Sequence, residues 1–290
     1  MTAFDPARWR IVDEVATRYI EGHTELADRW LLVQTLATAT SRRALLSSLG
    51  IGPGMRVLDV GTGFGPSVHE LAGAAGARAV GTDLDLGKLA AAEDMRQELA
   101  AAGWPAPPGA SAFVGGDVHR LPYGDATFDA TVVRFLYEDL PDPGAATAEL
   151  ARILRPGGVA CVIDVDDDLA VTYPPESRAL ERLRAAFTDM QETAGGDRRI
   201  GRRLAGILDA GGFDVTAVLA IPQASYGASS PDDPGRRFLV ERFATARDQV
   251  VGGGFIDGDE FDELLDVLRH EETPAQTVIE AHVAVVGRRR

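Results

Sequence analysis

The spacing of apolar residues divides this chain of 290 residues into three regions. Between residue 51 and about residue 170, short apolar runs alternate with segments of helical periodicity. Strands that alternate with helices build a parallel sheet with helices on both faces. We expect such strands at residues 57–60, 78–82, 111–115, 128–134 and 159–165. The central region is therefore predicted to be an α/β domain.

The regions on either side of this core have different patterns. The first 50 residues have helical periodicity that is interrupted at Gly22, whereas residues 213–221 and 277–286 predict two further strands with helical patterns between them. The predicted organisation begins with a helical cap at residues 1–50. The core follows in two pieces, residues 51–222 and 276–290, and a helical insertion at residues 223–275 lies between these pieces. Because ligands bind at the carboxyl ends of the strands in open α/β sheets, we expect the cap and the insertion to cover that edge as a lid.

The most informative stretch is the sequence VLDVGTGFG, from Val57 to Gly65. Asp59 lies at the end of the first predicted strand, and Pro66 suits the first turn of a following helix because its missing N–H costs nothing there. Glycine adopts positive φ without strain, and the missing Cβ lets a ligand lie against the backbone. Free N–H groups at the helix start favour a negatively charged ligand group. The turn therefore predicts a nucleotide-like ligand beside Gly61, Gly63 and Gly65.

Acidic residues follow the next two predicted strands. Asp83 comes about 20 residues after the glycines, where an acid can accept hydrogen bonds from both ribose hydroxyls of a nucleotide. Its alternative role, capping the next helix, is better filled by Asp85. Asp117 follows the third strand. The dinucleotide fingerprint requires a glycine where Pro66 stands, so the spacing argues against NAD.

Four motifs in this order resemble those of the class I S-adenosylmethionine-dependent methyltransferases. They are the glycine loop, the acid Asp83, the acid Asp117, and the pair of segments RFLYEDLPDP and RILRPGGVACVIDVDDD, which begin at Arg134 and Arg152. The resemblance is greatest to the type 11 and ubiquinone-biosynthesis-like small-molecule group. It implies a Rossmann-like sheet of seven strands, mostly parallel with the last strand antiparallel, and a small-molecule substrate from secondary metabolism.

The resemblance also implies the cofactor S-adenosylmethionine, with S-adenosylhomocysteine as product. In this family the acid at Asp117 accepts a hydrogen bond from the adenine amino group, and the next backbone N–H faces the ring. The cofactor contacts expected from the matching positions are Asp59, Gly61, Thr62, Gly63, Gly65, Asp83, Leu84, Asp117, Val118 and Arg134.

The chain departs from the family where members commonly have Gln-His, because Glu138 and Asp139 stand there. A histidine base is thus not expected at that position. We predict Asp139 and His23 as catalytic groups; His23 is titratable near neutrality, although an ordinary turn residue is the alternative. The predicted substrate contacts are Tyr137, Glu138, Asp164 and Tyr173. Two other functions stay open: a non-methylating reaction such as cyclisation, elimination or decarboxylation, or a non-catalytic partner-binding role.

Charge and composition narrow the partners. The net charge of −15 argues against nucleic acid and anionic membranes, whose phosphates would be repelled. No metal is predicted, since the carboxylates from Asp164 to Asp168 alternate in direction along a strand. Four arginines with helical spacing are expected on a solvated face, namely Arg198, Arg199, Arg202 and Arg203.

The remaining expectations concern compartment and assembly. The single cysteine, Cys161, lies in an apolar run and is expected in the core. The first ten residues lack the apolar stretch of a signal peptide, and no apolar run reaches the length of a membrane span, so a cytoplasmic location is expected. A homodimer is an open alternative to a monomer.

Overall fold

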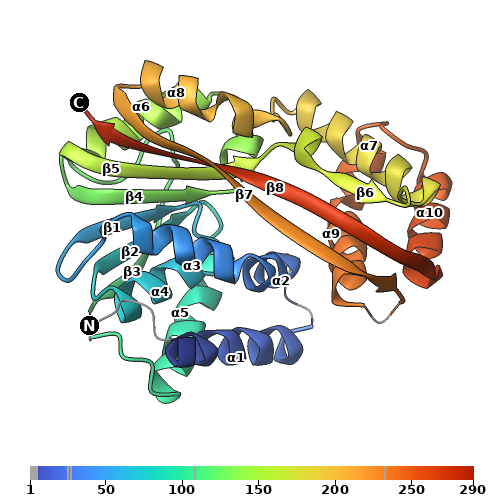
Figure 1. The fold of residues 1–290 in the computed structure, drawn as a ribbon, viewed down its shortest axis with the longest axis horizontal. Helices are drawn as coiled ribbons and strands as arrows, with labels where there is room; N and C mark the ends of the chain where they lie inside the picture. The colour runs from blue at the N-terminus through green and yellow to red at the C-terminus, as the bar shows by residue number, and fades with distance from the viewer. Residues whose placement is uncertain (1–5, 25, 27, 108, 232) are drawn as a thin grey trace.

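A computed structural model describes residues 6–24, 26, 28–107, 109–231 and 233–290 of this chain. Its centre is a parallel sheet with helices on both faces (Figure 1). The parallel strands are β1 Arg56–Val60, β2 Arg78–Asp83, β3 Ser111–Gly115, β4 Phe128–Arg134 and β5 Leu154–Val165. They lie in the order β3-β2-β1-β4-β5, and helices α4 Pro66–Ala74, α5 Leu86–Ala101 and α6 Pro143–Ile153 connect them. The predicted α/β class is confirmed.

Two long antiparallel strands complete the sheet. Strand β8, Thr273–Arg289, pairs with β5 on one side and with β7, Phe213–Ser229, on the other. Each has 17 residues, longer than the sequence predicted, and their pairing runs from Phe213 opposite Arg289 to Ser229 opposite Thr273. The short strand β6, Val171–Tyr173, pairs with the outer part of β8, so the sheet of the described residues has eight strands where seven were expected.

The predicted insertion is thus part ribbon and part helix. At the far end of the β7–β8 ribbon, helices α9 Pro234–Gly252 and α10 Gly258–His270 pack against α7 Arg178–Thr193 (Figure 1). Their shared apolar cluster includes Leu183, Phe243 and Phe261. The Asp257 side chain accepts hydrogen bonds from the first N–H groups of α10, as expected of a capping residue. These helices have an apolar core of their own, separate from the core of the sheet.

The remaining helices are short. The single-turn segments η1 Tyr137–Asp139, η2 Asp167–Leu169 and η3 Ile200–Arg203 follow β4, β5 and α7, and α8 Leu204–Ala210 precedes β7. One apolar face of the sheet packs against α6 and α8, and the opposite face packs against α3 and α4. Cys161 is fully buried in the core, as predicted. Among the described helices, none has the length and apolar character that crossing a membrane requires.

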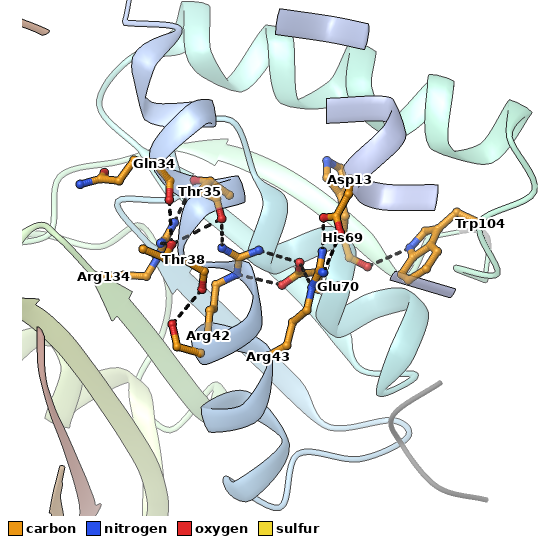
Figure 2. A network of polar contacts seen from close by, with 11 residues as sticks. Asp13, Gln34, Thr35, Thr38, Arg42, Arg43, His69, Glu70, Trp104 and Arg134 are labelled. Atoms are coloured by element: carbon orange, nitrogen blue, oxygen red, sulfur yellow. Dashed lines mark hydrogen bonds and ion pairs between the residues drawn. The ribbon is translucent and has the colours of Figure 1, made fainter. Parts of the chain in front are cut away.

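The N-terminal cap consists of α1 Pro6–Gly22, α2 Trp30–Ala37 and α3 Ala39–Ser48. A buried ionic network fastens it to the core, as Figure 2 shows. Glu70, on α4, accepts hydrogen bonds from Arg42 and Arg43 on α3, and Arg43 also pairs with Asp13 on α1. The network therefore joins three helices, and α3 is a fixed part of the fold.

Candidate functional site

The loop after β1 has the conformation that its glycines were expected to allow. Gly61, Gly63 and Gly65 all have positive φ, at 68°, 54° and 75°. A Cβ at Gly65 would lie 2.5 Å from the Phe113 ring, and one at Gly61 would lie 3.1 Å from Leu136, whereas no atom of the described residues lies within 4 Å of a Cβ at Gly63. Two of the glycines thus serve close packing, and the third faces open space just before the start of α4.

Asp59 and Thr62 stabilise this loop from inside. The Thr62 hydroxyl donates a 2.6 Å hydrogen bond to the Asp59 carboxyl, and both side chains are buried. Burial raises the pKa of Asp59 to about 6, although the Thr62 hydrogen bond and the charge of Arg134 act against the rise. Asp59 therefore sits below the glycine turn as a buried, readily protonated acid.

Asp83 lies directly beside the loop at the end of β2. Its Oδ2 accepts a hydrogen bond from the Gly63 N–H at 2.8 Å, and its Oδ1 accepts one from the Asp85 N–H at 3.0 Å. A carboxylate has about four lone-pair sites, so both oxygens can accept further donors. Asp85 caps α5 by accepting from the N–H groups of Gly87 and Lys88, which confirms its predicted role. Leu84 between the two acids is 72% exposed.

Asp117 and Val118 follow β3 at the same edge of the sheet. The Asp117 Oδ1 accepts hydrogen bonds from the His119 backbone and ring, and these contacts lower the pKa of the Asp117 carboxyl. In the part of the chain that the structure describes, Oδ2 accepts no hydrogen bond from protein. Val118 is buried in the core. An acceptor oxygen is therefore available beside an apolar residue, as an adenine ring would require.

Arg134, at the end of β4, reaches the N-terminal cap. Its guanidinium donates to the hydroxyls of Thr38 at 2.7 Å and Thr35 at 3.0 Å (Figure 2). Burial, with the nearby charge of Arg42, lowers the pKa of Arg134 to about 9, so the group stays charged at neutral pH. The structure thus gives Arg134 a role in holding α2 and α3, and its predicted cofactor contact stays a prediction.

The residue after Arg134 has a strained backbone. Phe135 has a φ of 54°, in the left-handed region that a bulky residue rarely enters. Such strain is typically found at functional sites, where the surrounding structure enforces it. Here the enforcing group is Asp164 on β5, whose Oδ2 accepts from the N–H groups of Leu136 and Tyr137 at 3.1 and 2.8 Å.

These contacts give two of the predicted substrate residues a place in the core. Asp164 is fully buried, and its Oδ1 accepts a hydrogen bond from the Val165 N–H, so both oxygens hold the backbone. The Tyr137 ring is also fully buried, its hydroxyl lies 2.9 Å from the Thr147 hydroxyl, and burial raises its pKa. Both side chains point into the core, where Asp164 bonds the backbone of the turn after β4 and Tyr137 contacts Thr147. Neither is accessible to a substrate in this structure.

Glu138 and Asp139 are neighbours in the sequence, but Glu138 is buried and Asp139 is exposed. Glu138 is buried in an ion pair with Arg198, which also pairs with Asp167. Asp139 is exposed and accepts a 2.7 Å hydrogen bond from the Gln191 amide on α7. A buried carboxylate already neutralised by arginine is a poor substrate ligand. Of the two carboxylates, the structure leaves only Asp139 accessible.

The four arginines from Arg198 to Arg203 were expected on a solvated face, and for Arg198 this was wrong. Its guanidinium is buried, because it compensates the buried Glu138. Arg199 and Arg202 pair with Asp168, and Arg202 also pairs with Asp166. The acidic run after β5 is thus bound by arginines, and the described residues contain no cluster arranged to hold a metal ion.

Two further predicted residues lie apart from Asp139. His23, which follows α1, has its Nδ1 3.0 Å from the Tyr19 carbonyl oxygen, and its ring stacks on the Tyr19 ring with centroids 4.1 Å apart. Tyr173, on β6, is 75% exposed. In the described part of the chain no hydrogen bond or ion pair joins either residue to Asp139. Their predicted roles stay predictions.

The sequence analysis missed His282. It lies on β8 with its ring centroid 4.8 Å from that of the strained Phe135. Burial, with the charges of Arg134 and Arg198, lowers its pKa to about 4, so the ring is neutral near pH 7. In the sequence His282 is a polar residue within a mostly apolar predicted strand. This pattern does not show which residues of the sheet its ring contacts.

Comparisons with known proteins agree with this geometry. Residues 58–162 match the protein family described as a methyltransferase domain. The demethylmenaquinone methyltransferase of Mycolicibacterium paratuberculosis is 41% identical over 152 residues, which are 51% of this chain and 60% of that protein. The enzyme of the same name from Mycobacterium marinum is 34% identical over 156 residues, covering 52% of this chain and 61% of that protein. The chain thus spans about three fifths of the length of these curated relatives.

Solved structures share the fold at low sequence identity. The geranyl diphosphate C-methyltransferase of Streptomyces coelicolor, solved with Mg²⁺, geranyl diphosphate and S-adenosylhomocysteine, has a TM-score of 0.51 and 14% identity, covering 92% of this chain and 85% of that chain. The [4+2]-cyclase SpnF has a TM-score of 0.53 and 18% identity, covering 88% of this chain and 81% of that chain. Because one of these is named a methyltransferase and the other a cyclase, the likeness defines a fold and leaves the reaction open.

Proposed function

We propose that this chain, whose residues 58–162 match a methyltransferase domain, is an enzyme that transfers a methyl group from S-adenosylmethionine to a small molecule. The observation that carries the proposal is the glycine turn. Three alternate glycines have positive φ, open space lies over Gly63, and Asp83 is hydrogen-bonded to that same residue. This arrangement suits a nucleoside that lies against backbone and is held by a carboxylate.

The residues around the turn fit S-adenosylmethionine. Asp83 would accept both ribose hydroxyls with its remaining lone pairs, and Oδ2 of Asp117 would accept the adenine amino group. The exposed Leu84 offers an apolar surface beside Asp83. The cofactor supplies a methyl group on a sulfonium, which a nucleophile attacks in line with the leaving sulfur. The protein must align that nucleophile and exclude water, and such positioning supplies about 7–11 kcal/mol of the barrier reduction.

Asp139 is the proposed proton acceptor. Its carboxyl is exposed in the turn that follows β4, close to the strained Phe135, and its hydrogen bond to Gln191 fixes its orientation. A hydroxyl or carbon acid would need such a base, whereas an amine would only have to arrive deprotonated. His23 is a second proposed base. His282 contacts the strained Phe135 and so borders the same turn.

We further propose a small metabolite as substrate, with neither nucleic acid nor membrane as a partner. The net charge of −15 supports this, because it repels polyanions. A product of secondary metabolism and a cytoplasmic location are the finer parts of the proposal. The first rests on the family resemblance, and the second on the composition of the sequence. The curated relatives are named for demethylmenaquinone, and whether this chain shares that substrate is part of the test.

A non-methylating reaction is the second candidate. It is favoured by Glu138, which is buried against Arg198 at a position where the group that the sequence resembles commonly carries glutamine. One experiment separates the two. Purified protein is incubated with S-adenosylmethionine and candidate acceptors, including demethylmenaquinone, and S-adenosylhomocysteine is measured.

The outcomes of this experiment are distinct. Stoichiometric S-adenosylhomocysteine with methylated acceptor establishes the transferase. Cofactor binding with product but without S-adenosylhomocysteine establishes the alternative. Calorimetry showing binding of NAD and not of S-adenosylmethionine or S-adenosylhomocysteine would overturn both.

A further inference from the structure

Arg242, on α9, has no counter-ion among the described residues. Its guanidinium lies over the ring of Trp30 on α2, 5.4 Å from the centroid, and over the ring of Phe187 on α7, 4.6 Å from the centroid. In the described part of the chain it makes no hydrogen bond or ion pair, and its Nε is enclosed by protein. Three helices that are far apart in sequence therefore surround one cation.

An arginine held between helices without an ion pair is costly. Aromatic faces return about 0.5–2 kcal/mol through cation–π contact, which does not replace the hydrogen bond that the buried Nε–H would make in water. Burial lowers the pKa of Arg242 to about 10, so the guanidinium remains charged near pH 7. Buried donors without acceptors are rare in proteins, and each calls for an explanation.

Two other polar atoms on the same helices lack partners among the described residues. The indole Nε1–H of Trp30 is a buried donor without an acceptor, and the Oε1 of Gln191 on α7 is a buried acceptor without a donor. Trp30 also contacts Phe238 on α9, with ring centroids 5.7 Å apart. The structure thus combines a cation, a second donor and several aromatic faces.

This group lies beside the proposed acceptor end of the site. Partial loss of contact with water raises the pKa of the Glu138 and Asp139 carboxyl groups in η1, and the nearby charge of Arg242 acts against this rise. Within the described residues neither carboxyl pairs with Arg242, because Glu138 is bound to Arg198 and Asp139 to Gln191. Arg29 beside Trp30 pairs with Glu241 beside Arg242, which fixes α2 against α9 at this place.

We propose that Arg242 and the Trp30 N–H bind an anionic head group, a carboxylate or a phosphate, on a substrate whose apolar body packs among the aromatic rings. This inference rests on the proposed function, since it names the chemical class of the methyl acceptor. An anion would supply acceptors for the Arg242 and Trp30 donors, and a planar guanidinium can donate two parallel hydrogen bonds to either group.

Calorimetry on protein saturated with S-adenosylhomocysteine tests the proposal with three probes of equal chain length. Octanoate and octyl phosphate carry the two candidate anions, and octanamide is neutral. We expect at least one charged probe to bind about 10-fold or more tightly than octanamide, as one bidentate charge-assisted contact would provide, and the stronger of the two identifies the head group. Equal binding of all three probes, or no binding of either anion at millimolar concentration, overturns the proposal.

Variants locate the site. Arg242→Gln should remove the preference for the charged probe, and Arg242→Lys should keep part of it. Trp30→Phe keeps an aromatic ring but removes the N–H, so a smaller loss is expected. The matched control is Arg247→Gln, which removes an exposed arginine paired with Asp262 from the same helix. An unchanged preference in Arg242→Gln, or an equal loss in Arg247→Gln, contradicts the proposal.

Two measurements keep these outcomes distinct from other failures. Circular dichroism and the melting temperature show whether Arg242→Gln is folded, and Arg242→Lys provides the result if it is not. Binding of S-adenosylhomocysteine should be unchanged in the Arg242 and Arg247 variants, because both residues lie on α9 and not at the glycine turn. If the wild-type protein fails to bind S-adenosylhomocysteine, the proposed function is wrong; if it binds it and ignores the anions, only the present inference is wrong.

Discussion

Arg42 donates two hydrogen bonds to Glu70, at 2.9 Å from Nε and 2.6 Å from Nη2, with both side chains almost fully buried. The pair joins α3 of the N-terminal cap to α4, the helix that begins at the glycine turn. Arg43 adds a third hydrogen bond to the same carboxylate. Helix α3 is therefore fixed to the core beside the glycine turn, and we expect any movement on ligand binding to occur in other helices.

Removing the charge of the shared carboxylate should be costly. Glu70→Gln leaves the buried Arg42 and Arg43 without this counter-charge, and breaking a buried pair in this way costs about 3–5 kcal/mol. Urea unfolding measures the loss. The control is Glu93→Gln, which breaks a surface pair with Arg96 and should cost below about 1 kcal/mol. Similar losses in the two variants would show that the buried network contributes little.

The glycines of the turn should separate binding from folding. Gly65→Ala places a Cβ 2.5 Å from Phe113 and should unfold the protein or lower its melting temperature strongly. Gly63→Ala has no such contact, so its cost is backbone strain of about 1–2 kcal/mol. Its new methyl group projects toward the proposed ligand. A folded Gly63→Ala protein that binds S-adenosylhomocysteine as well as the wild type would argue against a ligand at this turn.

Two acids that are two residues apart should have different effects. Asp83→Ala should weaken cofactor binding by about 2–4 kcal/mol, or roughly 30- to 1000-fold, because charge-assisted contacts to ribose are lost and water replaces them only in part. Asp83 also accepts from the Gly63 N–H, so we expect a loss of about 0.5–1.5 kcal/mol in the apo protein as well.

The comparison variant is Asp85→Ala, which removes the cap of α5. It should cost about 0.5–2 kcal/mol of apo stability and leave cofactor affinity nearly unchanged. Calorimetry and thermal melting with and without ligand measure both quantities. Loss of binding in Asp85→Ala with normal binding in Asp83→Ala would reverse the assignment of the two acids.

Asp59 should make stability depend on pH. Its pKa is about 6 in the folded protein, above the ordinary aspartate value of 3.8 that the unfolded chain has, so between these values the folded state holds more protons. Stability from this group is therefore full below about pH 4 and falls by about 2–3 kcal/mol as the pH rises through 6. Urea unfolding of wild type and Asp59→Asn from pH 4 to 7.5 isolates the effect. A difference between the two that is constant with pH would contradict it.

Hydrogen exchange should locate the moving parts. We expect α2 and α9 to become protected when cofactor and acceptor bind, because closure over the strand ends excludes water. In contrast, α3 should change little, since the Glu70 network already holds it. Exchange that is unchanged in α2 and α9 while the core responds would mean that the acceptor binds elsewhere.

Short-range signals account for what the sequence predicted well. The glycine turn, the Asp85 cap and the strands that precede each acid depend on neighbours within a few residues, and all lie where they were expected. The positive φ at Gly63 is available because the residue itself has no Cβ. The carboxyl ends of parallel strands then bring the acids to one edge of the sheet without further information.

Side-chain direction at the acceptor end depends on partners distant in sequence. Glu138 is buried because Arg198, 60 residues later, neutralises it. Asp164 turns inward because the strained turn at Phe135 presents N–H groups to it. His282 comes from the last strand, far along the chain from the turn that it contacts. Local pattern cannot reveal such pairs, so the burial of side chains after β4 and β5 was not predicted from the sequence.

The length of β7 and β8 has a consequence for how proteins with this fold could diversify. The two strands remain paired out to Ser229 and Thr273, so the helical segment between them leaves and re-enters the fold at adjacent points. A segment with adjacent ends can be exchanged for one of another length at small cost in loop entropy. Recombination at this junction would replace the proposed substrate-selecting residue Arg242 while the glycine turn and its acids stay intact. New specificities could therefore arise on one scaffold that keeps the proposed cofactor site.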